Sequence, residues 1–487
     1  MNTVQRIAKN TAILLVSTII SKVLGFFYVM YTARYLGAEG FGILSFALAF
    51  TGIFGVFADL GFNPLTVREV ARDKSLAKKY LNNISVMKAI LVTITFALIA
   101  IVINLLGYPE QTIKVVYLIS LSVVFNSFTG MFYSVFQAFE KMEYQSLGQI
   151  LNSALMLSGV MIVIKYNFTI IGFASLYLMA SIIILGYSLV ILRWKFSNTF
   201  FIWSPRKIEI DWSFWKTTIL KSLPFAFGGI FLMIYFWIDR VMLSLMEGDT
   251  VVGYYSAAYN LVNVLSFIPS AFVMAIYPVM SNYFKSSGSS LSKIYQHSVK
   301  YMYMLALPIA VGTMLLSKRI IYIIYGSEFF PSTQALNILI WAEFFVFMNI
   351  ILGQMLFSIN KENKNMFNAG VGALLNVVLN LLLIPKMSFV GAAIATVTTE
   401  LYFFIFAIYF ISKAQYKSEL SKVIPKPLLA TLIMGLFVHY FIQTSLFILI
   451  PISALIYFII LYLTGYWSDN DIKLIKQLLT SKSMEVD

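Results

Sequence analysis

"NTAILLVSTIISKVLGFFYVMYTARYLG" (residues 10–37) is longer than the roughly 20 apolar residues of a membrane-spanning helix, yet it carries Lys22 near its middle. A cation at that depth costs about 2.5–3.5 kcal/mol on insertion scales and is tolerated where it faces a bundle interior or a wet cavity. Thr11, Thr18, Lys22 and Gly25 recur at near-helical spacing and form one small, polar stripe. The alternative is a hydrogen-bond site between helices or a lysine that snorkels, but Lys22 is far from both ends of the run. The stretch therefore favours a cavity inside the membrane.

The composition places the chain among polytopic membrane proteins. Of its 487 residues 60% are hydrophobic and 11% charged, whereas soluble domains carry about 25% charged residues. The net charge of +14 is explained by basic cytoplasmic loops rather than by nucleic-acid binding. The chain has no cysteine, and His297 and His439 stand far apart, so we expect no metal site.

Apolar runs separated by polar breaks predict about fourteen membrane-spanning helices. They are expected at residues 11–35, 41–62, 84–107, 113–137, 146–164, 170–193, 217–246, 251–283, 300–324, 333–358, 366–384, 389–412, 428–444 and 446–465.

Basic residues set the expected orientation. They concentrate in alternate loops, beginning with the segment between Arg68 and Lys79, and this bias places both termini in the cytoplasm. The segment 196–216 combines tryptophans with charged residues and reads as an amphipathic linker on the inner leaflet. The predicted division is an N-terminal lobe (1–195), this linker (196–216), a C-terminal lobe (217–412), and two helices with a cytoplasmic tail (413–487).

An internal repeat supports two lobes of six helices each. "GFGILSFALAF" (40–50) aligns with "VVGYYSAAYNL" (251–261), which pairs Gly42 with Gly253. "TIIGFASLYLMA" (169–180) aligns with "SFVGAAIATVTT" (388–399) in the same order. Transporters built from parallel repeats bind their substrate between the lobes, near the middle of the membrane.

Polar side chains within the predicted spans are the candidate site. The residues expected at a substrate cavity are Lys22, Asp59, Asn126, Tyr133, Asn260, Asn263 and Asn376, and the candidates for ion coupling are Glu343, Glu400 and Asp239. Small and amide residues at helical spacing also form packing seams between helices, which is the alternative for each stripe. Lys88 is close enough to the inner face to snorkel, and Asp239 with Arg240 is read alternatively as an ion pair at an outer end.

No enzyme signature is found in the sequence. The chain lacks the phosphate-binding loop G-x-x-x-x-G-K-[ST], the zinc motif H-E-x-x-H and the nucleophile motif G-x-S-x-G. It also lacks the sizeable loop expected of a membrane polymerase or glycosyltransferase. We therefore expect a protein that is not an enzyme.

Several segments resemble polysaccharide flippases of the Wzx type, in the multidrug/oligosaccharidyl-lipid/polysaccharide exporter (MOP) superfamily. They are "ARYLGAEGFGILSFALAF" (33–50), "IDRVMLSLMEGDTVVGYYSAAYNL" (238–261), "YGSEFFPSTQALNIL" (325–339) and "NVVLNLLLIPKMSFVGAAIATVTTE" (376–400). The resemblance implies an all-α integral membrane fold: two six-helix lobes in a V around a central cavity, plus two C-terminal helices. Related peptidoglycan-precursor flippases carry a cationic residue on their first helix in a setting like "SKVLGF" (21–26), where Lys22 stands here.

The resemblance implies a flippase in the cytoplasmic membrane that moves an isoprenoid-diphosphate-linked oligosaccharide to the outer leaflet. No cofactor is expected beyond coupling to H⁺ or Na⁺. The expected partners are the lipid-linked substrate, membrane lipids and glycan polymerases or glycosyltransferases, without nucleic acid. Two alternatives stay open: a cation-coupled multidrug exporter of the same superfamily, and a membrane enzyme or non-transporting component of a glycan-assembly complex.

Overall fold

The computed structural model describes residues 3–196, 211–286, 288–416 and 423–467, which are nearly all helical. The helices are α1 (Thr3–Gly55), α2 (Phe62–Arg72), α3 (Ala77–Leu105), α4 (Glu110–Ala138), α5 (Met142–Lys165), α6 (Ile170–Lys195), α7 (Trp212–Glu247), α8 (Asp249–Leu265), α9 (Phe267–Ser286), α10 (Gly288–Tyr325), α11 (Ser332–Ser358), α12 (Glu362–Lys413), α14 (Pro425–Tyr440) and α15 (Leu446–Leu463). Short 3-10 turns, η1 (Lys74–Leu76) and η3 (Ser327–Phe329), precede α3 and follow α10. The all-α membrane prediction is confirmed.

Within the described residues, 11 helices are long and apolar enough to cross a membrane. Two of them are broken: α1 has non-helical dihedral angles at Gly37, and α12 has them at Ser388, just after Pro385. Each therefore covers two of the predicted spans. The short helix α14, with 16 residues, falls on a further predicted span. The chain is a multi-pass membrane protein, while the number fourteen and the predicted boundaries of the lobes stay predictions.

The structure corrects the prediction between residues 41 and 79. The helix expected at 41–62 ends at Gly55, and the positive φ angles of Leu60 (47°) and Gly61 (75°) turn the chain into α2. This short helix lies where a loop was expected, and it is amphipathic, with Phe62, Leu65, Thr66 and Val70 buried. Its apolar residues are too few for a membrane span, so a search for long apolar runs passes over it.

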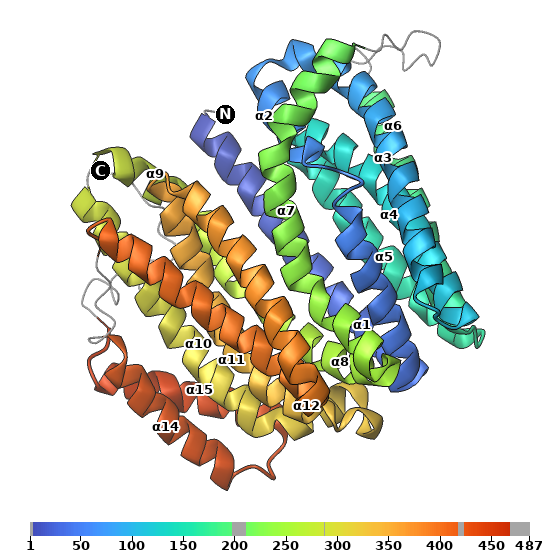
Figure 1. Cartoon of the computed structure of the whole chain (residues 1–487). Helices are drawn as coiled ribbons and strands as arrows, with labels where there is room; N and C mark the ends of the chain where they lie inside the picture. Colours follow the sequence, from blue (N-terminus) through green and yellow to red (C-terminus); the bar gives the residue numbers. More distant parts are fainter. Residues whose placement is uncertain (1–2, 197–210, 287, 417–422, 468–487) are drawn as a thin grey trace.

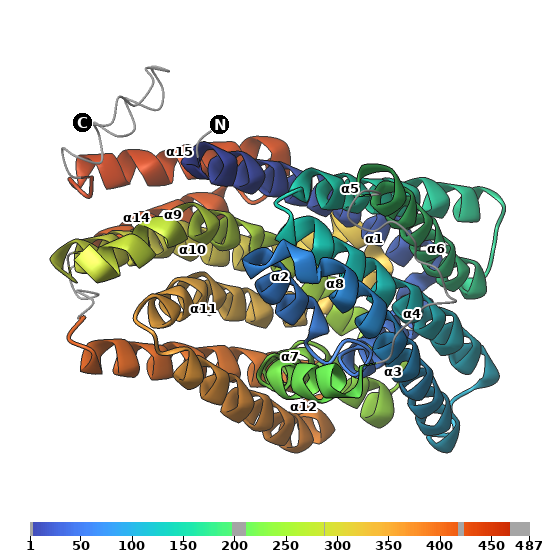
Figure 2. The ribbon, with the colours of Figure 1, turned by 90° about the horizontal axis from the view of Figure 1, so that it is seen from above.

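Figures 1 and 2 show the helices in two groups, with α3 to α6 on one side and α10 to α12 on the other. Between the groups, α1 packs against α5 and α8, and α7 packs against α1 and α12. The helices α14 and α15 lie on the flank beside α10 (Figure 1), where the Tyr457 hydroxyl donates to the Met304 carbonyl at 2.7 Å. The segment 197–210, within the predicted linker, lies outside the described residues, as do residues 468–487 of the predicted tail.

The break in α1 joins the two groups at one end of the molecule. Glu328 of η3 accepts a hydrogen bond from the Ala38 N–H at 2.7 Å, at the start of the second segment of α1. Arg34, just before the break, donates from Nε to the Ile324 carbonyl at 2.7 Å, at the end of α10. An anion thus lies at a helix N-terminus and a cation at a helix C-terminus, the favourable arrangement for both ends. We call this end, which also carries the α7–α8 junction, the closed end.

Candidate functional site

A cavity of about 580 Å³ lies between the two groups of helices. Its walls come from α4, α5 and α6 of one group, from α10 of the other, and from α1 and α8 between them. The lining side chains are mostly polar and small, and they comprise Thr18, Ser21, Lys22, Gly25, Phe26, Tyr28, Val29, Asn126, Thr129, Gly130, Tyr133, Gly148, Gln149, Asn152, Ser153, Ile184, Asn260, Asn263, Val264 and Tyr325. A volume of this order is typical of ligand sites.

Lys22 is the one charged residue among the described residues that line this cavity. It lies in the first segment of α1 and is partly exposed. In the described part of the chain, no carboxylate comes within ion-pair distance of its ammonium; Glu343 of α11 lies in electrostatic range. The neighbouring Ser21 hydroxyl is buried and has no hydrogen-bond partner within the described ranges. The cavity therefore offers a cation and a free hydroxyl side by side.

Five of the seven predicted cavity residues line the cavity. Asn126 and Tyr133 reach it from α4, Asn260 and Asn263 from α8, and Lys22 from α1. The side chain of Thr11, in the predicted stripe, lies outside those that the structure describes.

The sequence reasoning missed the face that α5 contributes. Gln149, Asn152 and Ser153 line the cavity beside Gly148. Their spacing of three to four residues was the signal that could have found them.

Asp59 and Asn376 lie elsewhere. Asp59, in the turn after α1, pairs with the Lys88 ammonium at 2.7 Å. Lys88 was expected to snorkel toward the inner face; its side chain is instead 0% exposed. Asn376 is buried in α12, where its Oδ1 accepts from Asn380 Nδ2 at 3.0 Å. Both residues belong to buried polar clusters rather than to the cavity lining.

Asp239 of α7 is the centre of the second cluster. Its carboxylate accepts hydrogen bonds from Tyr255 at 2.5 Å, Asn380 at 2.6 Å and Thr396 at 2.7 Å. In the described part of the chain, Asp239 and Arg240 interact electrostatically, but their side chains do not come within ion-pair distance of each other. Arg240 is buried, with its guanidinium 4.8 Å from the Trp237 ring centroid and 4.5 Å from that of Tyr259, a cation–π arrangement.

Glu343 and Glu400 form a buried acidic pair in the second half of the chain. Glu343 is 5% exposed and its Oε1 has no hydrogen-bond partner among the residues that the structure describes, whereas Glu400 is 6% exposed. Glu400 accepts hydrogen bonds from the Tyr235 hydroxyl and, at 2.6 Å, from Asn349 Nδ2. The two carboxylates interact electrostatically with each other, and Glu343 also with Lys22. Buried carboxylates without full pairing are costly, so such groups are candidates for binding a cation.

The family "Polysaccharide biosynthesis protein" matches residues 7–284, more than half of the chain. The chain belongs to this family. A second family, "MatE", matches residues 224–382 of this polysaccharide biosynthesis protein. The resemblance to polysaccharide flippases of the MOP superfamily, first seen in the sequence, is confirmed.

Two relatives of this polysaccharide biosynthesis protein are named as a flippase and a transporter. It is 23% identical over 421 residues to the probable low-salt glycan biosynthesis flippase Agl15 of Haloferax volcanii, covering 86% of this chain and 84% of that protein. It is 25% identical to a putative O-antigen transporter of Shigella flexneri, covering 65% of this chain and 76% of that one. The lipid II flippase MurJ in an inward closed conformation has the same fold, with a TM-score of 0.75 at 18% identity, covering 91% of this chain and 97% of MurJ.

Proposed function

We propose that the protein is a flippase of the cytoplasmic membrane, which moves an isoprenoid-diphosphate-linked oligosaccharide from the cytoplasmic to the outer leaflet by alternating access. The observation that carries this proposal is the ammonium of Lys22, which has no ion-pair partner among the described residues and lies in a polar cavity between the two groups of helices. A diphosphate cannot cross hydrocarbon unaided because of its charge. A cation inside the membrane that no described carboxylate neutralises can bind an anionic group of a substrate.

Lys22 binds a phosphate as a point charge, since its ammonium has three donors and no acceptor. The Ser21 hydroxyl, which has no partner in the structure, is placed to donate to the same phosphate. Amide side chains both donate and accept hydrogen bonds, and sugar hydroxyls need both. Asn126, Asn152 and Asn263 therefore contact the glycan, while the lipid tail stays in the bilayer through a gap between helices.

The proposed cycle places the closed end at the outer side of the membrane. Lys22 lies before the break at Gly37 by 15 residues, roughly 22 Å along the helix. The closed end, held by Arg34 and Glu328, is then the outer end, and both chain termini lie in the cytoplasm as the basic loops predict. Substrate enters from the inner leaflet, the closed end opens, and the cytoplasmic side closes behind the substrate.

The buried acids of the second half are proposed to couple this cycle to H⁺ or Na⁺. Glu343 lies close enough to Lys22 to sense its charge, so binding an anion at Lys22 alters the environment of Glu343. In the Asp239 cluster, Asn380 Nδ2 and the hydroxyls of Tyr255 and Thr396 donate hydrogen bonds to one buried carboxylate, whose negative charge is the third candidate for neutralisation by the coupling ion. A glycan polymerase or glycosyltransferases are the proposed partners in the membrane.

A cation-coupled multidrug exporter is the second candidate, favoured by the MatE match over residues 224–382 and by the buried acids. It is the weaker candidate, because an exporter of cationic drugs needs an acidic cavity and Lys22 makes this one basic. A catalytic or purely structural membrane component would not need a polar cavity between its halves.

Purified protein in liposomes separates these functions. A fluorescent isoprenoid-diphosphate-linked oligosaccharide should move between leaflets, whereas the same glycolipid without its diphosphate should not. Export of a cationic dye with no movement of the diphosphate lipid would favour the multidrug exporter. If neither the diphosphate-linked lipid nor the cationic dye moves across the membrane, both transport functions are contradicted.

A further inference from the structure

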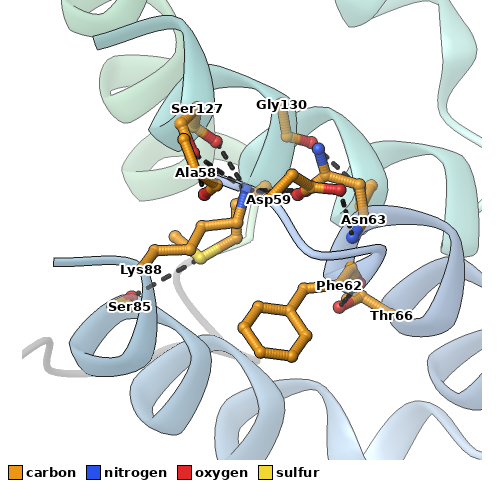
Figure 3. Close-up of polar contacts among 11 residues, drawn as sticks. Ala58, Asp59, Phe62, Asn63, Thr66, Ser85, Lys88, Ser127 and Gly130 are labelled. Carbon is orange, nitrogen blue, oxygen red and sulfur yellow. Dashed lines mark hydrogen bonds and ion pairs between the residues drawn. The ribbon is translucent and has the colours of Figure 1, made fainter. Parts of the chain in front are cut away.

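The ammonium of Lys88 in α3 is surrounded by oxygen atoms of other elements (Figure 3). Its ammonium donates to Asp59 Oδ1 at 2.7 Å and to Asn63 Oδ1 at 3.0 Å. It also donates to the Ser127 carbonyl at 2.8 Å, with the Ser127 hydroxyl at 3.3 Å. Three N–H donors thus meet oxygen atoms from the α1–α2 turn, from α2 and from α4.

The Ser127 side chain closes this cluster. Its hydroxyl donates to the Ala58 carbonyl at 2.9 Å, so α4 is tied to the α1–α2 turn both directly and through Lys88. A second contact joins α3 to α4, from the Ser85 hydroxyl to Met131 Sδ at 3.6 Å. The Lys88 side chain is 0% exposed and that of Asp59 25%, so removing Asp59 alone would leave a buried charge without its counter-ion, which is costly.

The same stretch of α4 forms a wall of the cavity. Asn126, Thr129 and Tyr133 line it, and at 100° per residue Ser127 points to an adjacent face of the helix. Gly130 lies between the two faces: a Cβ there would be 2.7 Å from Asn63 Nδ2. The Lys88 cluster therefore contacts α4 at Ser127, which is next to Asn126 of the cavity lining and lies on the adjacent face of the helix.

The α1–α2 turn also contacts the second half of the chain. Gly61, at φ 75°, packs so closely on α7 that a Cβ would lie 2.7 Å from the Ser222 carbonyl oxygen. The guanidinium of Arg68 in α2 lies 5.3 Å from the centroid of the Phe225 ring in α7. The α1–α2 turn, to which Lys88 is bonded, therefore contacts α7 at the end of the molecule opposite the closed end.

We propose that Lys88 is a positioning residue, whose ammonium fixes the cavity face of α4 to the α1–α2 turn and so couples the cavity to the contact of that turn with α7. The inference rests on the proposed function where it treats the cavity as the substrate site. Lys88 itself does not touch the substrate, because it is shut off from the cavity behind α4. Its effect reaches the substrate through the position of Asn126.

The absence of cysteine from the chain allows a direct test. One reporter is Asn126→Cys on α4, and the matched control is Asn152→Cys on α5; both positions are exposed and line the same cavity. Each is combined with Lys88→Ala, and the rate of labelling by a small thiol reagent is measured with and without propylammonium. This ion replaces the deleted part of the lysine, and propanol serves as the uncharged control. If Lys88→Ala does not accumulate in the membrane, Asp59→Asn/Lys88→Met removes both charges at similar volume.

Lys88→Ala should change labelling of Asn126→Cys on the order of tenfold, the usual size of coupling between sites, and leave Asn152→Cys unchanged. Propylammonium should restore the original rate and propanol should not. Equal changes at both cysteines would reveal general loosening and overturn the proposal, as would unchanged labelling at Asn126→Cys. The labelling needs no transport, so a parent protein that flips no lipid-linked glycan would disprove the proposed function without deciding the role of Lys88.

Discussion

Gly42 of α1 and Gly253 of α8 lie against each other's helices at the closed end. A Cβ on Gly42 would lie 1.7 Å from the Asp249 carbonyl oxygen, and one on Gly253 would lie 1.9 Å from that of Ala38. These two glycines are the pair that the internal repeat aligns. Neither position has room for a side chain, so the backbones of α1 and α8 touch directly and close this end of the molecule.

Gly253→Ala should therefore weaken this closure. Its methyl group meets backbone rather than a mobile side chain, and overpacking of this kind costs about 1–3 kcal/mol. We expect a shift toward the state open at the closed end, measured as faster labelling of Asn260→Cys by an impermeant thiol reagent added from the outer side. Gly186→Ala in α6 is the matched control, because a Cβ there meets nothing within 4 Å. Equal labelling in the two variants would show that the glycine contact does not hold this end closed.

The sequence predicted the cavity well where a single strong signal existed. Lys22 is too costly in a membrane span to be there without a polar surrounding, and the structure supplies one. The amides of α4 and α8 were found because they recur at helical spacing. The short helix α2 was missed because its apolar face is brief, whereas the face of α5 was passed over although Gln149, Asn152 and Ser153 recur at a similar spacing.

The partners of the buried charged residues could not be predicted from the sequence. Lys88 looked able to snorkel, and only the fold shows Asp59, 29 residues before it, beside its ammonium. Asp239 and Arg240 are adjacent in sequence, yet one lies among hydroxyl and amide groups and the other between aromatic rings. Partners brought together by tertiary packing leave no trace in the spacing of residues along one helix.

Glu400→Gln tests the proposed ion coupling. The amide keeps an acceptor for Tyr235 or Asn349 but removes the negative charge that a cation would neutralise. We expect flipping in liposomes to lose its dependence on an imposed H⁺ or Na⁺ gradient while exchange without a gradient continues. Glu362→Gln, at an exposed position in the first turn of α12, should behave as the parent protein. Unchanged gradient dependence in Glu400→Gln would remove Glu400 from the coupling.

The start of α7 should respond to acid through Asp211. The Lys79 ammonium, 2.8 Å from the Asp211 carboxylate, and the Phe214 N–H lower the pKa of this aspartate below its ordinary value of 3.8. A lowered pKa means that the stabilisation is fully present above the ordinary pKa and is lost as the pH falls through the lowered one. The difference in thermal unfolding temperature between the parent protein and Asp211→Asn should therefore be constant near neutral pH and vanish in strong acid. A difference that grows on acidification would contradict this account.

Flipping of an isoprenoid-diphosphate-linked oligosaccharide by Lys22→Ala in liposomes tests the central claim most directly. Lys114→Ala is the control, since Lys114 lies far from the cavity lining, paired with Glu110 at 2.6 Å. The account predicts that Lys22→Ala inserts normally but loses flipping by at least tenfold, about 1.4 kcal/mol of lost phosphate binding, whereas Lys114→Ala flips at the parent rate. Full flipping by a well-folded Lys22→Ala protein would contradict the anion site on which the account depends.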